Sequence, residues 1–168
     1  MSKVTQSPQA GRRYWLLKSD PDTFGWDDLM NAPNRTTHWD GVRNFQARNY
    51  MRDEMKKGDL VFFYHSGEPE PGIRGIAEIV REGYPDRTAL DPKDPHYDPK
   101  SKGTETPWVM VDIKAVEPLP RPVTLSEMRL KPELAGLPLL QKGNRLSVQK
   151  VGSAEWNAVL RIAKETKA

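Results

Sequence analysis

The chain contains no cysteine, and it has no long apolar run. Without cysteine there can be no disulfide bond, no thiol nucleophile and no zinc–thiolate site. This composition suits a reducing, intracellular compartment. The apolar stretches are too short for a transmembrane span or for the core of a signal peptide. We therefore expect a cytoplasmic protein with no membrane partner.

Signatures of catalysis are missing as well. The sequence has no Gly-x-Ser-x-Gly elbow and no Walker loop. No paired carboxylates stand at the end of an expected helix or strand. The histidines, His38, His65 and His96, are scattered and lack the helical spacing of a metal site. The sequence therefore predicts a protein that is not an enzyme and that holds no metal and no cofactor.

Proline and glycine are abundant instead, at 15 and 12 of the 168 residues. This abundance favours strands joined by ordered loops over a helical bundle, and the length suits one domain. Short apolar or alternating runs predict strands at 14–17, 59–64, 73–82, 108–116 and 146–151. Helical spacing and capping residues predict helices at 44–56, 124–130 and 153–164, with one or two helical turns within 23–30. Residues 84–107, with five prolines, are expected to form a long irregular loop.

These elements predict an α+β fold, namely a small, partly open β-barrel of about five to six strands flanked by helices. In the helix expected at 44–56, Ala47, Met51 and Met55 recur every four residues and should be buried. Asn44 is a plausible N-cap of that helix. Ser153 is the expected cap of the last helix.

Basic residues are concentrated in two segments of the chain, 35–57 and 141–150. The overall balance is only mildly basic, with 26 Lys plus Arg against 23 Asp plus Glu, so the total alone is weak support for a nucleic-acid partner. Their placement is more informative, although an ordinary solvated surface remains the alternative. The residues that we expect to contact phosphate are Arg43, Arg48, Arg52, Lys142 and Arg145.

Aromatic and small polar residues stand where the predicted strands end. The segments concerned are 18–19, 38–44, 64–66 and 145–147. Because the ends of successive strands in a small barrel gather at one rim, these segments can converge on one concavity. Aromatic faces, amide and hydroxyl groups and a basic edge together suit a planar heteroaromatic ring attached to a phosphate backbone.

In two of these segments, the sequence leaves two directions open for the side chains, into the concavity or away from it. Trp39 lies between His38 and an Asp-Gly pair, which favours a partly exposed ring able to stack on a base over a core tryptophan. Strand residues alternate in direction, so either Tyr64 and Ser66 or His65 face the concavity. We favour Tyr64 and Ser66, because a lone histidine is more typical of a satisfied polar corner.

The sequence resembles the EVE domain, a relative of the PUA and YTH domains. The resemblance rests on six pieces in order: "YWLLKSDPDTFGWDDL", "WDGVRNFQARNYM", "KKGDLVFFYHSG", "PGIRGIAEIVREGYPD", "PHYDPKS" and "RLSVQ". It implies a PUA-like pseudo-barrel over 13–164. The polar residues 1–12 are expected to form a disordered tail, and 165–168 a short tail. The base pocket that the resemblance implies consists of Lys18, Ser19, Trp39, Asn44, Tyr64, His65, Ser66 and Ser147.

The resemblance also implies a function. It predicts a monomeric, non-catalytic module that flips a modified base, most simply 5-methylcytosine or an oxidised derivative in DNA, into this pocket. Such a protein would associate with the nucleoid in a bacterium and would be nuclear in a eukaryote. Three alternatives stay open: a reader of modified RNA, an enzyme that acts on a modified nucleotide through His65, and a protein-interaction module if side chains fill the pocket.

Overall fold

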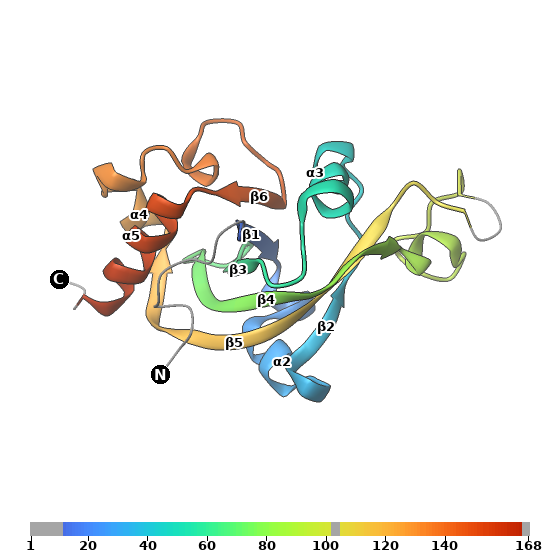
Figure 1. Cartoon of the computed structure of the whole chain (residues 1–168), viewed down its shortest axis with the longest axis horizontal. Coiled ribbons are helices and arrows are strands. Elements are labelled where there is room, and N and C mark those ends of the chain that lie inside the picture. Colours follow the sequence, from blue (N-terminus) through green and yellow to red (C-terminus); the bar gives the residue numbers. More distant parts are fainter. Residues whose placement is uncertain (1–11, 102–104, 166–168) are drawn as a thin grey trace.

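One open, mixed β-sheet organises the molecule (Figure 1). The computed structural model describes residues 12–101 and 105–165, so the predicted tails fall almost entirely outside the described residues. The strands are β1 (Tyr14–Ser19), β2 (Thr36–Trp39), β3 (Leu60–His65), β4 (Gly72–Pro85), β5 (Val109–Thr124) and β6 (Val148–Val151). Their order in the sheet is β2-β5-β4-β3-β1-β6, with β2 and β6 at the two edges. The predicted α+β fold with a partly open barrel is confirmed: the sheet curves but does not close.

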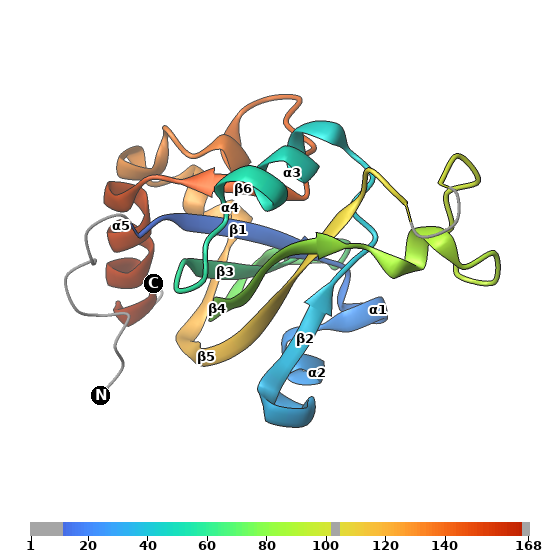
Figure 2. The same ribbon diagram turned by 45° about the vertical axis from the view of Figure 1, so that its right-hand side comes forward.

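Short helices cover the sheet at its ends. They are α1 (Pro21–Phe24), α2 (Trp26–Asn31), α3 (Phe45–Asn49), α4 (Leu125–Arg129) and α5 (Ser153–Lys164). Helix α3 continues into a π-helical turn at Tyr50–Glu54. Helices α4 and α5 lie together at one end, while α1 and α2 lie beside β2 (Figure 2). Within the described residues, no helix has both the length and the apolar character that a membrane crossing needs.

The two faces of the sheet bury two separate apolar clusters. In β3, Phe62 and Tyr64 belong to the cluster under α5, whereas Val61 and Phe63 belong to the cluster that also contains residues of α2 and α3. This division follows from the alternation of side chains along a strand. Because both faces are covered, the central strands read as continuous apolar runs rather than alternating ones. Trp156 of α5 stacks on Phe62 with 3.8 Å between ring centroids.

Local features of the sequence explain where several elements begin and end. The Asn44 side chain accepts a hydrogen bond from the Ala47 N–H at 3.0 Å, which confirms the predicted N-cap. Ala47, Met51 and Met55 are buried as expected. Ser153 is not the cap of α5, because Gly152 occupies that position. Strand β2 was not predicted at all.

Strands β4 and β5 are longer than their sequence patterns predict. They pair from Gly72↔Thr124 to Pro85↔Val109, with several register shifts along the way. The shifts break the simple alternation on which the sequence prediction relied. The resulting hairpin projects to the right in Figure 1 and carries the loop around 86–108 at its tip. Its described residues, 86–101 and 105–108, contain a 3-10 turn at Arg87–Leu90 and no further helix or extended strand, as predicted for an irregular loop.

Candidate functional site

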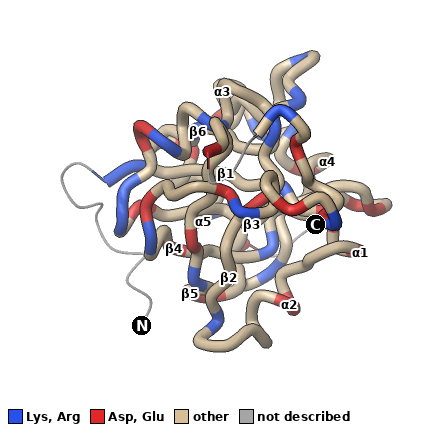
Figure 3. Tube along the Cα trace, turned by 90° about the vertical axis from the view of Figure 1, so that its right-hand side faces the viewer, with Lys and Arg blue, Asp and Glu red and all other residues tan. Residues whose placement is uncertain are grey.

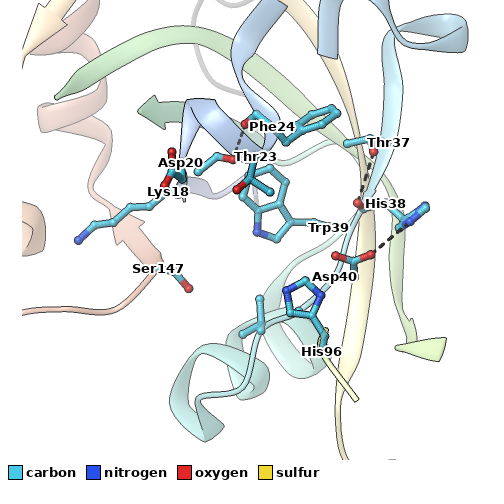
Figure 4. A pocket seen from close by; sticks show the side chains of 13 residues that line it. Lys18, Asp20, Thr23, Phe24, Thr37, His38, Trp39, Asp40, His96 and Ser147 are labelled. Carbon is cyan, nitrogen blue, oxygen red and sulfur yellow. Dashed lines mark hydrogen bonds and ion pairs between the residues drawn. The ribbon is translucent and has the colours of Figure 1, made fainter. Parts of the chain in front are cut away.

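A cavity of about 470 Å³ opens where β1 and β2 end, beside α1. This volume falls in the range of small-ligand sites. Residues from several parts of the chain line it, among them Lys18, Ser19, Trp39, Asp40, His96 and Ser147. In Figure 4, Lys18 and Ser147 lie on one side of Trp39, and Asp40 and His96 lie on the other.

Strand pairing brings the first part of this lining together. Strand β1 runs antiparallel to β6, so the end of β1 meets the segment that leads into β6. The Lys18 N–H donates to the Ser147 carbonyl at 2.9 Å, and the Ser19 hydroxyl donates to the Phe24 carbonyl of α1. The structure therefore brings Lys18, Ser19, Trp39 and Ser147, four of the eight residues predicted for the base pocket, around one cavity.

The predicted exposure of Trp39 was wrong. Its side chain is buried, at 9% exposure, and its ring meets Phe63 edge-on, with centroids 5.6 Å apart. The reason is the alternation of the unpredicted strand β2, which directs His38 outward and Trp39 inward. Trp39 thus has two roles, because it belongs to an apolar cluster and also forms part of the cavity wall.

The segment Tyr64-His65-Ser66 does not line the cavity, which corrects the orientation favoured from the sequence. Tyr64 points into the cluster under α5. His65 Nε2 accepts a hydrogen bond from the Trp26 N–H at 2.9 Å, and Nδ1 lies 2.9 Å from a Glu68 oxygen. This pattern assigns the proton to Nδ1 and makes His65 a satisfied polar corner.

Ser66 supports the rim of the cavity through a backbone hydrogen bond to Ser19. The Ser66 N–H donates to the Ser19 carbonyl at 2.9 Å, which ties the end of β3 to the rim of the cavity. The polar ending of β3 therefore holds α2 and the end of β1 in place and does not itself form the cavity. Asn44 also lies outside the lining, because its side-chain oxygen serves as a helix cap.

The basic residues expected to contact phosphate differ in whether they already form ion pairs or hydrogen bonds within the fold. Arg43 is fully engaged: it lies 3.0 Å from the buried carboxylate of Asp86 and donates to the His96 carbonyl at 2.6 Å. Arg48 donates to the Pro107 carbonyl at 2.9 Å, and Arg52 pairs with its neighbour Asp53. Lys142 and Arg145 are exposed.

Two ionisable groups of the lining have shifted pKa values. Burial raises the pKa of Asp40, an effect partly offset by His38, whose Nε2 lies 3.3 Å from the carboxylate. Burial also lowers the pKa of Lys18. Both shifts follow from the partial burial of these groups in the cavity wall, and perturbed pKa values are found often at functional sites. Asp40 was not singled out from the sequence, although its place beside Trp39 was visible there.

Gly41 fixes the shape of the cavity next to Asp40. Its φ of +77° favours glycine, and a Cβ atom there would lie 2.7 Å from His96 Nε2. The Gly41 N–H donates to Asp86 at 2.9 Å. The Asp-Gly pair in the sequence was the available signal for this close approach. In the part of the chain that the structure describes, no group of three or more potential metal ligands is present.

The curved open sheet and the cavity at its strand ends define a PUA-like domain. More specifically, the chain belongs to the EVE domain family, whose sequence profile matches residues 13–162. Thymocyte nuclear protein 1 of Gallus gallus is 44% identical in an alignment that covers 90% of this chain and 69% of the relative.

Two solved structures extend this comparison. Human THYN1 protein, crystallised in complex with 5-methylcytosine-containing DNA, superposes with a TM-score of 0.87 at 38% identity, covering 92% of this chain and 99% of that one. The YTH domain of the Zygosaccharomyces rouxii MRB1 protein, in complex with N6-methyladenosine RNA, has a TM-score of 0.51 at 12% identity, covering 97% and 91%. At this low identity the second likeness concerns the fold alone.

Proposed function

We propose that this chain is a non-catalytic reader of a modified base in nucleic acid, with 5-methylcytosine or an oxidised derivative in DNA as its ligand. The observation that carries the proposal is the cavity of about 470 Å³ that places the Asp40 carboxylate beside the Trp39 ring. The complex of human THYN1 protein with 5-methylcytosine-containing DNA supports the choice of ligand. A base stacked inside a duplex cannot reach such a cavity, so the base is flipped out of the helix or comes from a single strand.

The lining offers a complement to the polar edge of cytosine. The exocyclic N4 amino group of cytosine is a donor, and carboxylates accept from it. Asp40 supplies that acceptor in the cavity wall. Ser147 and Lys18, on the opposite side of Trp39, offer a hydroxyl group and an ammonium donor for the ring acceptors of the base (Figure 4).

The modified group itself meets an apolar part of the lining that includes Phe24, Trp39 and Val42. Burying one carbon contributes about 0.8 kcal/mol, and a tight pocket raises the contribution of a methyl group to at most about 3 kcal/mol. The expected preference for 5-methylcytosine over cytosine is therefore tens-fold at most. Stacking and edge contacts must supply most of the energy that flipping costs.

The geometry also supports a binding role over a catalytic one. His65, the side chain for which the sequence left an acid or base role open, has both ring nitrogens engaged by Trp26 and Glu68 away from the cavity. Incubation with excess modified nucleosides and oligonucleotides should leave them unchanged by mass spectrometry. A product that disappears in a His65→Ala variant would overturn the non-catalytic assignment.

The test of ligand choice is a titration of matched oligonucleotides. DNA and RNA strands of one sequence, with cytosine, 5-methylcytosine or thymine at a single central position, are compared by fluorescence anisotropy at fixed salt. We expect the 5-methylcytosine DNA to bind most tightly. Equal binding of all the strands, or no binding, would overturn it, and a preference for the modified RNA would reassign the partner.

A further inference from the structure

A second aromatic surface lies next to the cavity. Among the described residues, the exposed large hydrophobic side chains are Phe45 at 57%, Tyr97 at 37% and Leu130 at 80%. Phe45 and Tyr97 both line one depression of about 440 Å³. Two of these three unusual side chains therefore share one site, whereas isolated exposed apolar residues need no explanation.

The exposed Phe45 ring is held in a fixed position. It stacks on the buried Trp108 ring, with centroids 4.7 Å apart and an interplanar angle of 28°. The Arg48 guanidinium lies 5.0 Å from the Phe45 centroid and is itself fixed by its hydrogen bond to the Pro107 carbonyl. Trp108 is held in turn, because its Nε1–H donates to Asp98 at 2.7 Å. An ordered ring of this kind loses little entropy when a partner covers it.

The charges around the aromatic surface favour an anionic partner. Arg48 and Lys100 border it, and neither forms an ion pair with another described residue. Asp98, the one acid in the described lining, is engaged by Trp108. The hydrogen bond from Trp108 is the main reason why the pKa of Asp98 is lowered. Planar rings interleaved with cations are the pattern that single-stranded nucleic acid contacts.

The aromatic surface is also continuous with the base cavity. His96 lines both depressions. Along the chain, Phe45 follows the cavity residues Asp40, Gly41 and Val42 by only a few positions. A strand whose modified base enters the cavity would therefore pass the Phe45 ring with its next nucleotides.

We propose that Phe45, together with the Arg48 guanidinium that lies over its ring and backed by Trp108, forms a second stacking position, which binds a base that flanks the modified base on the same strand. This inference rests on the proposed function, because it takes the cavity as the site of the modified base. Stacking of a base on an aromatic side chain is insensitive to sequence. The second position would thus add affinity and leave the choice of modification to the cavity.

The experiment separates the two positions by the size of the probe. One probe is the free nucleoside 5-methyl-2′-deoxycytidine, which reaches only the cavity. The second is a short single-stranded oligonucleotide with one central 5-methylcytosine. The third is the same oligonucleotide with abasic sites on both sides of the modified base. Each is titrated calorimetrically into the wild-type chain and into Phe45→Ala, with Leu130→Ala as the matched control for loss of an exposed apolar side chain.

The expected result is a loss that depends on the flanking bases. Phe45→Ala should weaken binding of the intact oligonucleotide about 5- to 150-fold. It should leave the affinities for the nucleoside and for the abasic strand unchanged. Leu130→Ala should match the wild type on all three probes. Phe45→Leu, which keeps packing on Trp108 but removes the planar ring, should show an intermediate loss and guards against a folding defect of the alanine variant.

Two outcomes would overturn the inference. Equal binding of the intact oligonucleotide by the wild type and Phe45→Ala would show that Phe45 does not stack on a flanking base. An equal loss on all three probes would show that Phe45 only shapes the cavity. In both cases the proposed function survives if the wild type still prefers 5-methylcytosine. It fails separately if the wild type binds neither the nucleoside nor the modified strand.

Discussion

The Arg43 guanidinium lies 3.0 Å from the Asp86 carboxylate, which is fully buried. Asp86 also accepts hydrogen bonds from the N–H of Gly41 and from Thr88. Arg43 in turn donates to the carbonyl of His96. This pair therefore joins the wall of the cavity to the loop that carries His96, and it links the cavity to the aromatic surface around Phe45.

Removing Arg43 should destabilise the fold. Arg43→Ala would leave the buried Asp86 carboxylate without its charged partner, which costs about 3–5 kcal/mol when both ions are buried. Because the Arg43 side chain is 25% exposed, we expect the lower end of that range. Urea unfolding of the variant measures the loss, with the exposed Arg145→Ala as the control. A change within about 0.5 kcal/mol would contradict the structural role.

The Arg43–Asp86 pair also predicts how the stability of the fold depends on pH. Burial alone would raise the pKa of Asp86, but hydrogen bonds from Thr88, Gly41 and Arg43 outweigh it and leave the pKa below its usual value. A group whose pKa is depressed on folding stabilises the protein above its unfolded pKa, about 3.9 for Asp. That stability is lost as the pH falls through the lower folded pKa. Melting temperatures of the wild type should therefore fall below about pH 4 more steeply than those of Asp86→Asn. Parallel curves would contradict this assignment.

Asp40 should discriminate cytosine from thymine bases. Thymine carries the same methyl group but presents an acceptor where cytosine presents the N4 donor. An unsatisfied buried acceptor costs about 1–3 kcal/mol. Because the Asp40 side chain is 26% exposed and lies near His38, we expect the low end of that range, so the wild type should bind 5-methylcytosine about 5- to 10-fold more tightly than thymine in the same strand. Asp40→Leu should remove most of this preference. If Asp40→Leu still prefers 5-methylcytosine over thymine as strongly as the wild type does, another residue recognises the N4 amino group.

The protonation of Asp40 gives the same contact a pH dependence. Burial raises the pKa of Asp40 above the usual range of an aspartate, and only the ionised carboxylate accepts without competition from its own proton. Binding of 5-methylcytosine should therefore weaken as the pH falls through this raised pKa. Asp40→Asn should abolish the part of the pH dependence that belongs to this group. Anisotropy titrations of both proteins at a series of pH values provide the measurement.

Binding should also depend strongly on salt, although the charges are mixed. Figure 3 shows Lys and Arg positions interspersed with Asp and Glu positions, and the net charge is only +3. Arg43 and Arg52 are paired with acids, so fewer free cations remain than the sequence indicates. Three phosphate contacts would give a log–log slope of about −2 to −3. The double change Lys142→Ala with Arg145→Ala should reduce the slope by about 1.4–1.8. A slope near zero in the wild type would contradict binding to nucleic acid.

Trp39 requires a conservative substitution because it is buried. Trp39→Ala should cost about 3–5 kcal/mol of stability, which would confuse a binding measurement. Trp39→Phe keeps an aromatic ring against Phe63 and should lower affinity for the modified strand with a smaller loss of stability. Full affinity in a folded Trp39→Phe variant would show that the indole ring is not needed in the cavity wall.

A monomeric state and a cytoplasmic location stay predictions.

The sequence by itself determined the fold class and much of the core. Apolar runs identified the central strands, and the spacing of Ala47, Met51 and Met55 with Asn44 in front located the α3 region. These features depend on neighbours along the chain, where period and capping are readable. The motif pieces also placed Lys18, Ser19, Trp39 and Ser147 around one cavity.

Tertiary structure alone decided how those residues are used. Whether Trp39 is exposed depended on β2, a four-residue edge strand defined only by its pairing with β5. Whether Arg43 is free depended on Asp86, which lies 43 positions away in the sequence. The role of His65 was likewise settled by the Trp26 N–H, 39 positions away. Orientation and partner choice are set by contacts distant in sequence, and no local pattern records them.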